Sequence, residues 1–121
     1  MATIIPTFSK IRGPAGGIDA VVATWTGLAA SGDLGQPLQR TDLVDRSVQV
    51  AGTFSAATLV FEGSNDGTNY FTLSNPSGTA LLFTAAGLMQ VTEATAWVRP
   101  HVTAGSGADL TVTLTARRTL R

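Results

Sequence analysis

The sequence predicts an all-β protein: an antiparallel β-sandwich, a jelly roll of about eight strands, with an extended N-terminal arm. Two observations predict this fold class. Apolar and polar residues alternate with a period of two in many segments from residue 18 onward, and Gly, Asn and Pro turn signals separate these segments. Such alternation is typical of strands with one face in a core and one in water. A chain of 121 residues has room for a single two-layer core.

Four segments carry the alternation most clearly. In DLTVTLTARR (109–118) every second residue from 110 to 116 is apolar, and threonines lie between them. The other three are IDAVVATWTG (18–27), with Val21, Ala23 and Trp25 opposite Val22, Thr24 and Thr26; SVQVAGTF (47–54), with Val48 and Val50 opposite Gln49; and ATLVFEG (57–63), with Leu59 and Phe61 opposite Thr58, Val60 and Glu62. β-Branched residues, which are frequent here, suit strands.

Shorter strands are expected near residues 36–40, 70–74, 80–84, 88–92 and 96–103. Residues 41–46 are compatible with one helical turn, and no helix of normal length is expected. Pro100 cannot donate a ladder hydrogen bond, so we expect its strand to be an edge strand or to be bulged there.

The N-terminal residues differ from the rest of the chain. Residues 1–17 contain two prolines, three glycines and Lys10, and their other notable side chains are Ile4, Ile5, Phe8, Ile11 and Arg12. Proline and glycine prevent a stable helix, whereas frayed termini are normally polar. The composition predicts an extended arm over residues 1–17, ahead of a sandwich domain over 18–121. It leaves open whether the arm docks on a neighbouring molecule or on its own domain.

Charge and composition exclude several classes of protein. Eight basic residues balance eight acidic ones, without the basic excess that nucleic-acid binding usually needs. The chain has no cysteine, which excludes disulfides, thiolate metal sites and cysteine nucleophiles, and favours an intracellular origin. No apolar run approaches the length of a membrane helix, and the first residues do not resemble a signal peptide.

The stretch FEGSNDGTNYF (61–71) has the composition of a calcium loop, a sugar-binding loop or a turn. Calcium needs several oxygen ligands, and Asp66 is the only carboxylate between Gly63 and Asn69. Asn, Asp and Gly between two alternating runs are typical of a hairpin. The sequence therefore predicts a turn that joins the strand around Leu59–Phe61 to a strand around Tyr70–Leu73.

No constellation of catalytic or metal-binding residues is apparent. His101 is the only histidine, and no serine lies in a nucleophile elbow. The acidic pairs Asp42/Asp45 and Glu62/Glu93 are expected to be solvated surface residues. The glycines of 13–17 lack the Lys-Ser/Thr pair of a phosphate-binding loop. We therefore expect no enzymatic activity, no catalytic residue, no metal site, no cofactor and no small-molecule substrate.

Trp97, Arg99 and His101 share one face of a predicted strand and form a candidate contact surface. Tryptophan and arginine are enriched where protein interfaces are anchored. The alternative is that Trp97 belongs to the core, with Val98 and Val102 facing outward. The alternation alone leaves both possibilities open.

Residues 48–118 resemble small virion proteins of tailed bacteriophages. The shared pattern is V-x-G-T-F at 50–54, E-G-S-N-D-G-x-N-[WY] at 62–70 and [WY]-V-R-P at 97–100. The resemblance implies a capsid decoration, or cement, protein. Such a protein has a β-sandwich or jelly-roll fold, sits on the outer surface of the capsid, bridges major capsid proteins and often self-associates.

The resemblance sets specific expectations. The partners are the major capsid protein and further copies of the chain, as a dimer or trimer, with no nucleic acid or membrane partner. The chain is made in the bacterial host cytoplasm and ends up on the virion. We expect capsid contact through the arm and a second interface on the later strand; the residues are Ile4, Ile5, Phe8, Ile11 and Arg12 for the first, and Trp97, Arg99 and His101 for the second.

Similar hairpins occur in phage tail and baseplate proteins and in carbohydrate-binding sandwiches. The alternative is therefore a phage tail, baseplate or fibre module, which is structural or binds carbohydrate. A sugar-binding module would use exposed aromatic side chains as stacking platforms. The candidates are Trp25, Tyr70 and Trp97.

Overall fold

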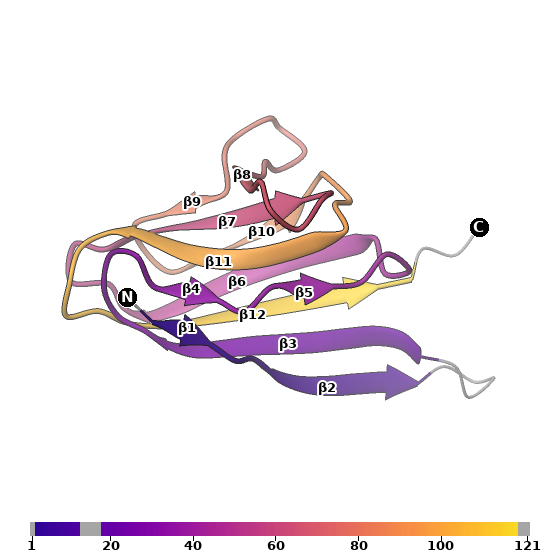
Figure 1. Ribbon diagram of the computed structural model, residues 1–121, viewed down its shortest axis with the longest axis horizontal. Coiled ribbons are helices and arrows are strands. Elements are labelled where there is room, and N and C mark those ends of the chain that lie inside the picture. The colour runs from indigo at the N-terminus through magenta and orange to yellow at the C-terminus, as the bar shows by residue number, and fades with distance from the viewer. Residues whose placement is uncertain (1, 13–17, 119–121) are drawn as a thin grey trace.

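The computed structural model describes residues 2–12 and 18–118 (Figure 1). Within these ranges the chain forms twelve strands and no helix. The strands are β1 (Thr3–Ile4), β2 (Thr7–Arg12), β3 (Ile18–Leu28), β4 (Leu34–Gly35), β5 (Leu38–Gln39), β6 (Asp45–Thr53), β7 (Thr58–Ser64), β8 (Phe71–Thr72), β9 (Leu82–Phe83), β10 (Gly87–Val91), β11 (Trp97–Ala104) and β12 (Asp109–Arg117). None of the described residues belongs to a helix long and apolar enough to cross a membrane.

The strands form two sheets that pack face to face. One has five strands in the order β10-β6-β12-β3-β2, and the other has seven, in the order β1-β4-β11-β7-β8 with β5 beside β11 and β9 beside β7. If β4 and β5 count as one interrupted strand, and β8 and β9 as another, β3 to β12 make eight strands. All successive ones except β7 and β8 lie in opposite sheets. This is the jelly-roll arrangement, so the predicted fold class is confirmed.

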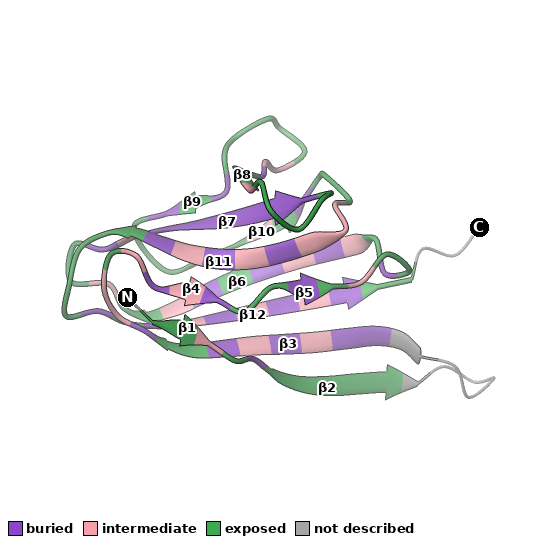
Figure 2. Ribbon diagram, viewed as in Figure 1, coloured by how far each residue is buried: buried purple, intermediate pink, exposed green. Residues whose placement is uncertain are grey.

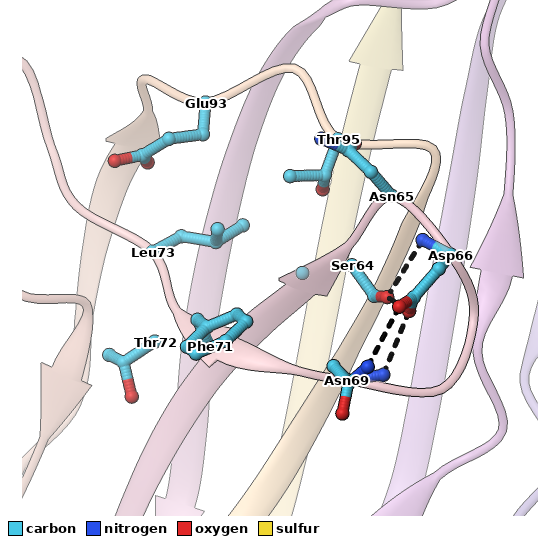
Figure 3. A pocket seen from close by; sticks show the side chains of 10 residues that line it. Ser64, Asn65, Asp66, Asn69, Phe71, Thr72, Leu73, Glu93 and Thr95 are labelled. Carbon is cyan, nitrogen blue, oxygen red and sulfur yellow. Dashed lines mark hydrogen bonds between the residues drawn. The ribbon is translucent and has the colours of Figure 1, made fainter.

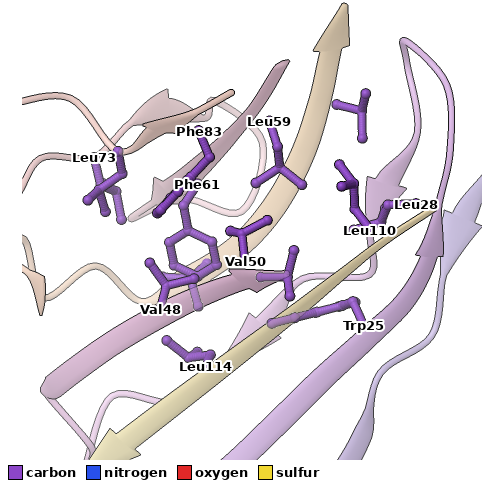
Figure 4. Packing of buried hydrophobic residues seen from close by; sticks show 14 of the residues in the cluster. Trp25, Leu28, Val48, Val50, Leu59, Phe61, Leu73, Phe83, Leu110 and Leu114 are labelled. Carbon is purple, nitrogen blue, oxygen red and sulfur yellow. The ribbon is translucent and has the colours of Figure 1, made fainter. Parts of the chain in front are cut away.

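The core lies between the sheets and consists of the faces that the alternation predicts (Figure 4). Trp25 from β3 and Phe61 from β7 are both 0% exposed, and their rings meet edge to face with centroids 6.4 Å apart. Fully burying one such side chain stabilises the fold by about 1.5–3 kcal/mol. The largest fully buried side chains are Trp25, Phe61, Leu28, Leu43, Leu59, Leu81, Leu110, Leu114, Val21, Val48, Val50 and Val98.

Two local predictions are wrong. The strand that holds Pro100 is not an edge strand, because β11 lies between β7 on one side and β4 with β5 on the other. The strand is not bulged at Pro100 either, because Pro100 pairs in regular register with Phe61 of β7 and the register shifts only after Val102. No residue of β4 or β5 is in register with Pro100. Proline is tolerated there because its missing N–H faces the gap between these two short strands. Residues 41–46 form bends and the start of β6 instead of a helical turn.

The N-terminal segment is extended, as predicted, and its described residues join the sandwich. β1 pairs in parallel with β4, and β2 pairs antiparallel with β3, so the segment contributes an edge to each sheet. Ile4 packs against the core. Figure 2 shows β2 exposed along most of its length. Of the two possibilities left open, these residues pack on their own domain. The predicted boundary between an arm over 1–17 and a sandwich over 18–121 adjoins residues 13–17, which lie outside the described residues, and it stays a prediction.

Two buried charged side chains, Asp33 and Arg46, form hydrogen bonds that hold loops against the sandwich. Asp33 accepts backbone N–H groups of Ala2 and Ala29 at 2.9 Å and of Ala30 at 3.0 Å. The hydrogen bond from Ala29, followed by those from Ala30 and Ala2, lowers the pKa of Asp33. Arg46 donates to three backbone carbonyls, of Leu43, Thr95 and Arg40. Burial lowers the pKa of Arg46 from its high ordinary value.

Candidate interaction surfaces

Trp97, Arg99 and His101 lie on the outer face of β11 and are half-buried. Val98 and Val102, at the alternate positions of the strand, are buried in the core. The prediction that the three side chains share one outward face is therefore confirmed, and the alternative with Trp97 in the core is wrong. Their role as an interface stays a prediction.

Glu62 of β7 links two of these side chains. The register places Glu62 directly opposite Arg99. Arg99 Nε donates to Glu62 Oε1 at 3.0 Å, and His101 Nδ1 lies 3.0 Å from Oε2. Glu62 is only 9% exposed, so the expectation of a solvated side chain is wrong. The cause is its position in an interior strand, where Glu62 pairs with Arg99 of β11 on one side and with Thr72 of β8 on the other.

Tyr70 covers the pair from the solvent side. The Arg99 guanidinium lies 3.8 Å from the centroid of the Tyr70 ring, a cation–π contact. The Tyr70 hydroxyl is buried, with no hydrogen-bond partner among the described residues, and burial raises the pKa of Tyr70. We call Glu62, Tyr70, Arg99 and His101 the Glu62 cluster. The sequence predicts other roles for Glu62 and Tyr70. The register of β7 against β11 places Glu62 beside Arg99 and His101, and the turn after β7 brings Tyr70 onto Arg99.

Glu62→Gln is expected to lower the free energy of unfolding by about 1–2 kcal/mol, because hydrogen bonds to a charged group are stronger than neutral ones. Chemical denaturation measures the change. Asp42→Asn is the matched control. It disrupts the exposed Arg40–Asp42 pair, with N and O 2.7 Å apart, and is expected to cost under about 1 kcal/mol. Equal effects of the two variants would contradict the importance of the Glu62 cluster.

The segment Ile5–Ile11 runs along an edge of the molecule and exposes three apolar side chains, of which Phe8 and Ile11 lie on opposite faces of the sheet. Ile5 is 75% exposed, Phe8 53% and Ile11 52%, whereas Ile4 is turned toward the core. Arg12 is the last residue of β2, and its side chain lies outside the described residues. Three of the five predicted capsid-contact residues are thus exposed together.

The two predicted surfaces belong to different elements of the sandwich. β1 lies next to β4 and β4 next to β11, so Thr3, Leu34 and His101 form one cross-strand row. The strand that carries Trp97, Arg99 and His101 is therefore separated from β1 by β4, in the seven-stranded sheet. Ile11 and Phe8 lie on β2, the edge of the five-stranded sheet. The fold presents the two groups as separate surfaces.

The hairpin prediction for residues 61–71 is confirmed, because β7 and β8 pair antiparallel. Asp66 closes the turn: its Oδ1 accepts the backbone N–H groups of Thr68 and Asn69 at 2.8 Å. Oδ2 accepts the Asn69 side-chain amide at 2.8 Å, and Ser64 Oγ also donates to Oδ1 (Figure 3). These donors, with the Asn69 N–H the strongest, hold the pKa of Asp66 far below its ordinary value.

An open pocket of about 350 Å³ lies between this turn and residues 93–95 (Figure 3). Most of its polar side chains already have partners within the protein. Glu93 accepts from Ser74 N and Oγ at 2.8 and 2.6 Å, and Asn65 Oδ1 accepts from Ala96 N at 3.2 Å. Such groups build the turn, and few of them remain to bind a ligand. Within the described residues, no group of three metal-ligating side chains comes together.

The aromatic residues considered as sugar-stacking platforms are not free. Trp25 is entirely buried in the core, so its assignment as a platform is wrong. One face of Tyr70 is occupied by Arg99. Gly67 lies against Trp97, so closely that a Cβ added at Gly67 would be 3.3 Å from the indole ring. Phe71 is the exposed aromatic residue beside the pocket.

Acid is expected to destabilise the protein below about pH 4, where ordinary carboxyl groups become protonated. Asp33, Asp66 and Glu93 all have pKa values below the ordinary range. The folded state therefore holds these protons less tightly than the unfolded state. Their contribution to stability is complete above the unfolded-state pKa and is lost as the pH falls through the folded-state values. Thermal unfolding between pH 6 and pH 2.5 measures it, and an unchanged Tm across that range would contradict it.

The fold resembles that of known structures, although neither a protein-family model nor a curated protein sequence matches the chain. The chain is similar to the SPBc2 prophage-derived protein YomS, at 14% identity with a TM-score of 0.60, over 80% of this chain and 93% of that one. A double-stranded β-helix protein from Klebsiella pneumoniae has 14% identity and a TM-score of 0.44, over 96% of this chain and 75% of that one. An oxalate oxidase has 11% identity and a TM-score of 0.47, over 93% and 51%. Only the first similarity is close enough to support a shared fold.

Proposed function

We propose that this protein is a structural component of a bacteriophage particle, which binds the outside of the capsid and stabilises the shell by bridging major capsid proteins. The observation that carries the proposal is the exposed apolar segment on a compact sandwich, with Ile5, Phe8 and Ile11 all more than half exposed. Exposed apolar side chains that lie close together mark protein contact sites. The proposal assigns no reaction to the chain.

Bridging requires at least two contact surfaces, and the sandwich offers two. The apolar N-terminal segment and the outer face of β11 lie on separate elements. Trp97 and Arg99 are of the residue types that anchor interfaces. Because many copies would act together on one shell, each contact need only be modest. The prophage origin of YomS, a protein of similar fold, supports a phage role.

The decisive experiment is cryo-electron microscopy of virions of the phage whose genome encodes the chain. We expect density for the sandwich at positions repeated over the icosahedral shell, with the residues around Ile5 against a capsid subunit. Density confined to the tail would overturn the capsid proposal and favour the tail or baseplate alternative. Absence of the protein from virions would overturn both.

Co-sedimentation with shells from a phage deletion mutant lacking this protein tests the contact. Ile5→Asp is expected to reduce binding at least tenfold, because it places a charge in an apolar contact. Leu88→Asp is the matched control. Leu88 is similarly exposed but lies on β10, the edge of the five-stranded sheet opposite to β2. Equal binding of the Ile5→Asp and wild-type proteins would contradict the assignment.

A further inference from the structure

Strand β2 is an open edge of the five-stranded sheet. It pairs with β3 on one side only, as the last strand in the sheet order. All five residues from Thr7 to Ile11 are exposed, and their pairing with β3 is regular until the shift after Ile11. An unpaired strand edge presents backbone N–H and C=O groups that can bind another strand.

The register against β3 fixes the face that each side chain occupies. Phe8 pairs with Ala23, a core residue, so Phe8 and Lys10 lie on the core side of the sheet. Thr7, Ser9 and Ile11 lie on the outer side, by alternation. The apolar side chains of β2 are thus divided between the two faces, and Phe8 and Ile11 each remain about half exposed.

We propose that β2 pairs antiparallel with β2 of a second copy, across a two-fold axis at Ser9. The two five-stranded sheets then form one continuous sheet. The contact is isologous, so each copy contributes the same residues and the assembly closes as a dimer. This inference goes beyond capsid attachment, and it assigns Phe8 and Ile11 to the dimer seam, so that Ile5 is the residue of this segment left for the capsid.

Matching of faces limits the possible registers. Residues directly opposite each other in a sheet share a face. The axis must therefore place one residue of β2 opposite the same residue of the second copy. An axis at Lys10 sets the two lysine side chains opposite each other, which is destabilising. An axis at Phe8 sets Pro6, which has no N–H, opposite Lys10 inside the ladder, and sets Ile11 opposite Ile5, which precedes the start of β2.

The register centred on Ser9 has neither defect. It pairs the whole regular run 7–11 with itself. Phe8 of one copy then lies opposite Lys10 of the other on the core side, which allows a cation–π contact. Thr7 lies opposite Ile11 on the outer side, where Ile11 loses part of its exposure. Capsid contact then falls to Ile5 and to the outer face of β11.

Single-cysteine variants test the register directly, because the chain has no cysteine of its own. Directly opposed residues have Cα atoms about 4.5–5.5 Å apart, within the range of a disulfide. Under mild oxidation of the purified protein, Ser9→Cys is expected to give a disulfide-linked dimer. Phe8→Cys and Lys10→Cys are expected to give little disulfide-linked dimer. In this register each of these cysteines is displaced by two residues along the strand from the same cysteine of the second copy. Preferential linking of either control, or of none of the three, would overturn the proposed axis.

Charge variants test the dimer without any cross-link. Sedimentation velocity of the wild-type protein is expected to show a species of twice the mass of the 12.5 kDa chain. Phe8→Lys sets lysines against each other across the seam and is expected to weaken dimerisation at least tenfold. Adding Lys10→Glu to Phe8→Lys is expected to restore it. A wild-type monomer at every concentration, or failure of the double variant to recover while still folded, would overturn the proposal. A monomer would leave Phe8 and Ile11 available for capsid contact, and the shell experiments measure that contact separately.

Discussion

Asp33→Ala is expected to lower the free energy of unfolding by about 3 kcal/mol and to loosen residues 2–12. The substitution removes the acceptor for three backbone N–H groups, at Ala2, Ala29 and Ala30. Each donor left without a partner in a buried place costs about 1–3 kcal/mol. The Ala2 bond lies directly before β1, so its loss weakens the attachment of the N-terminal segment. Chemical denaturation and amide hydrogen exchange over residues 3–12 measure the two effects.

Two companion variants make the Asp33 result interpretable. Asp33→Asn keeps one acceptor oxygen and is expected to show an intermediate loss. Asp109→Ala removes a carboxylate from an exposed position at the start of β12 and is expected to change stability by less than about 0.5 kcal/mol. Unchanged exchange over residues 3–12 in Asp33→Ala would show that β1 and β2 are held by other contacts. Loosening of β2 should also weaken the proposed dimer.

Arg46→Met is expected to lower the free energy of unfolding by about 3 kcal/mol. Methionine fills a similar volume but donates no hydrogen bond, so the carbonyls of Leu43, Thr95 and Arg40 lose their shared donor. Arg46 is 3% exposed, and little water can replace it. Urea denaturation measures the shift of the midpoint, and an unchanged slope would show that the unfolded state is not the cause.

Arg46→Lys separates the charge from the geometry. Lysine keeps the positive charge but cannot reach three carbonyls with a planar fork, so we expect it to be nearly as destabilising as methionine. Arg117→Met is the surface control, because its contact with Asp45 is exposed and 3.5 Å long. Wild-type stability in Arg46→Met would mean that the carbonyls find other donors.

The strands that alternate cleanly were predictable from the sequence because one buried face imposes period two. Residues 109–118 show this best, since every second side chain of β12 enters the core. Alternation does not say which face is buried, and for β11 the choice between Trp97 and Val98 required the facing sheet. The sequence predicts one strand near 36–40, whereas the structure has β4 at Leu34–Gly35 and β5 at Leu38–Gln39. The two are separated where β11 carries Pro100, which has no N–H to donate to them.

The candidate surfaces were less predictable than the fold. Ile5, Phe8 and Ile11 are exposed because the N-terminal segment joins each sheet only at its edge. The composition of the segment does not reveal this position. The sequence does not distinguish Asp33 and Arg46 from ordinary surface charges. Their partners are backbone groups, which no particular residue type reveals. Glu62 lies in an apolar run, and its link to Arg99, 37 residues later, depends on strand register.

The turn between β8 and β9 offers a site for displaying foreign peptides. Asn75 N donates to Thr79 O at 2.9 Å, and Asn75 Oδ1 accepts the N–H groups of Ser77 and Thr79, so the turn is closed at its base. Its tip, Gly78, has open space around it. Figure 1 shows this loop projecting from the side of the sandwich opposite to β2. A peptide inserted between Ser77 and Gly78 would extend away from the proposed dimer seam, so a particle coated with this protein would carry it as an antigen array.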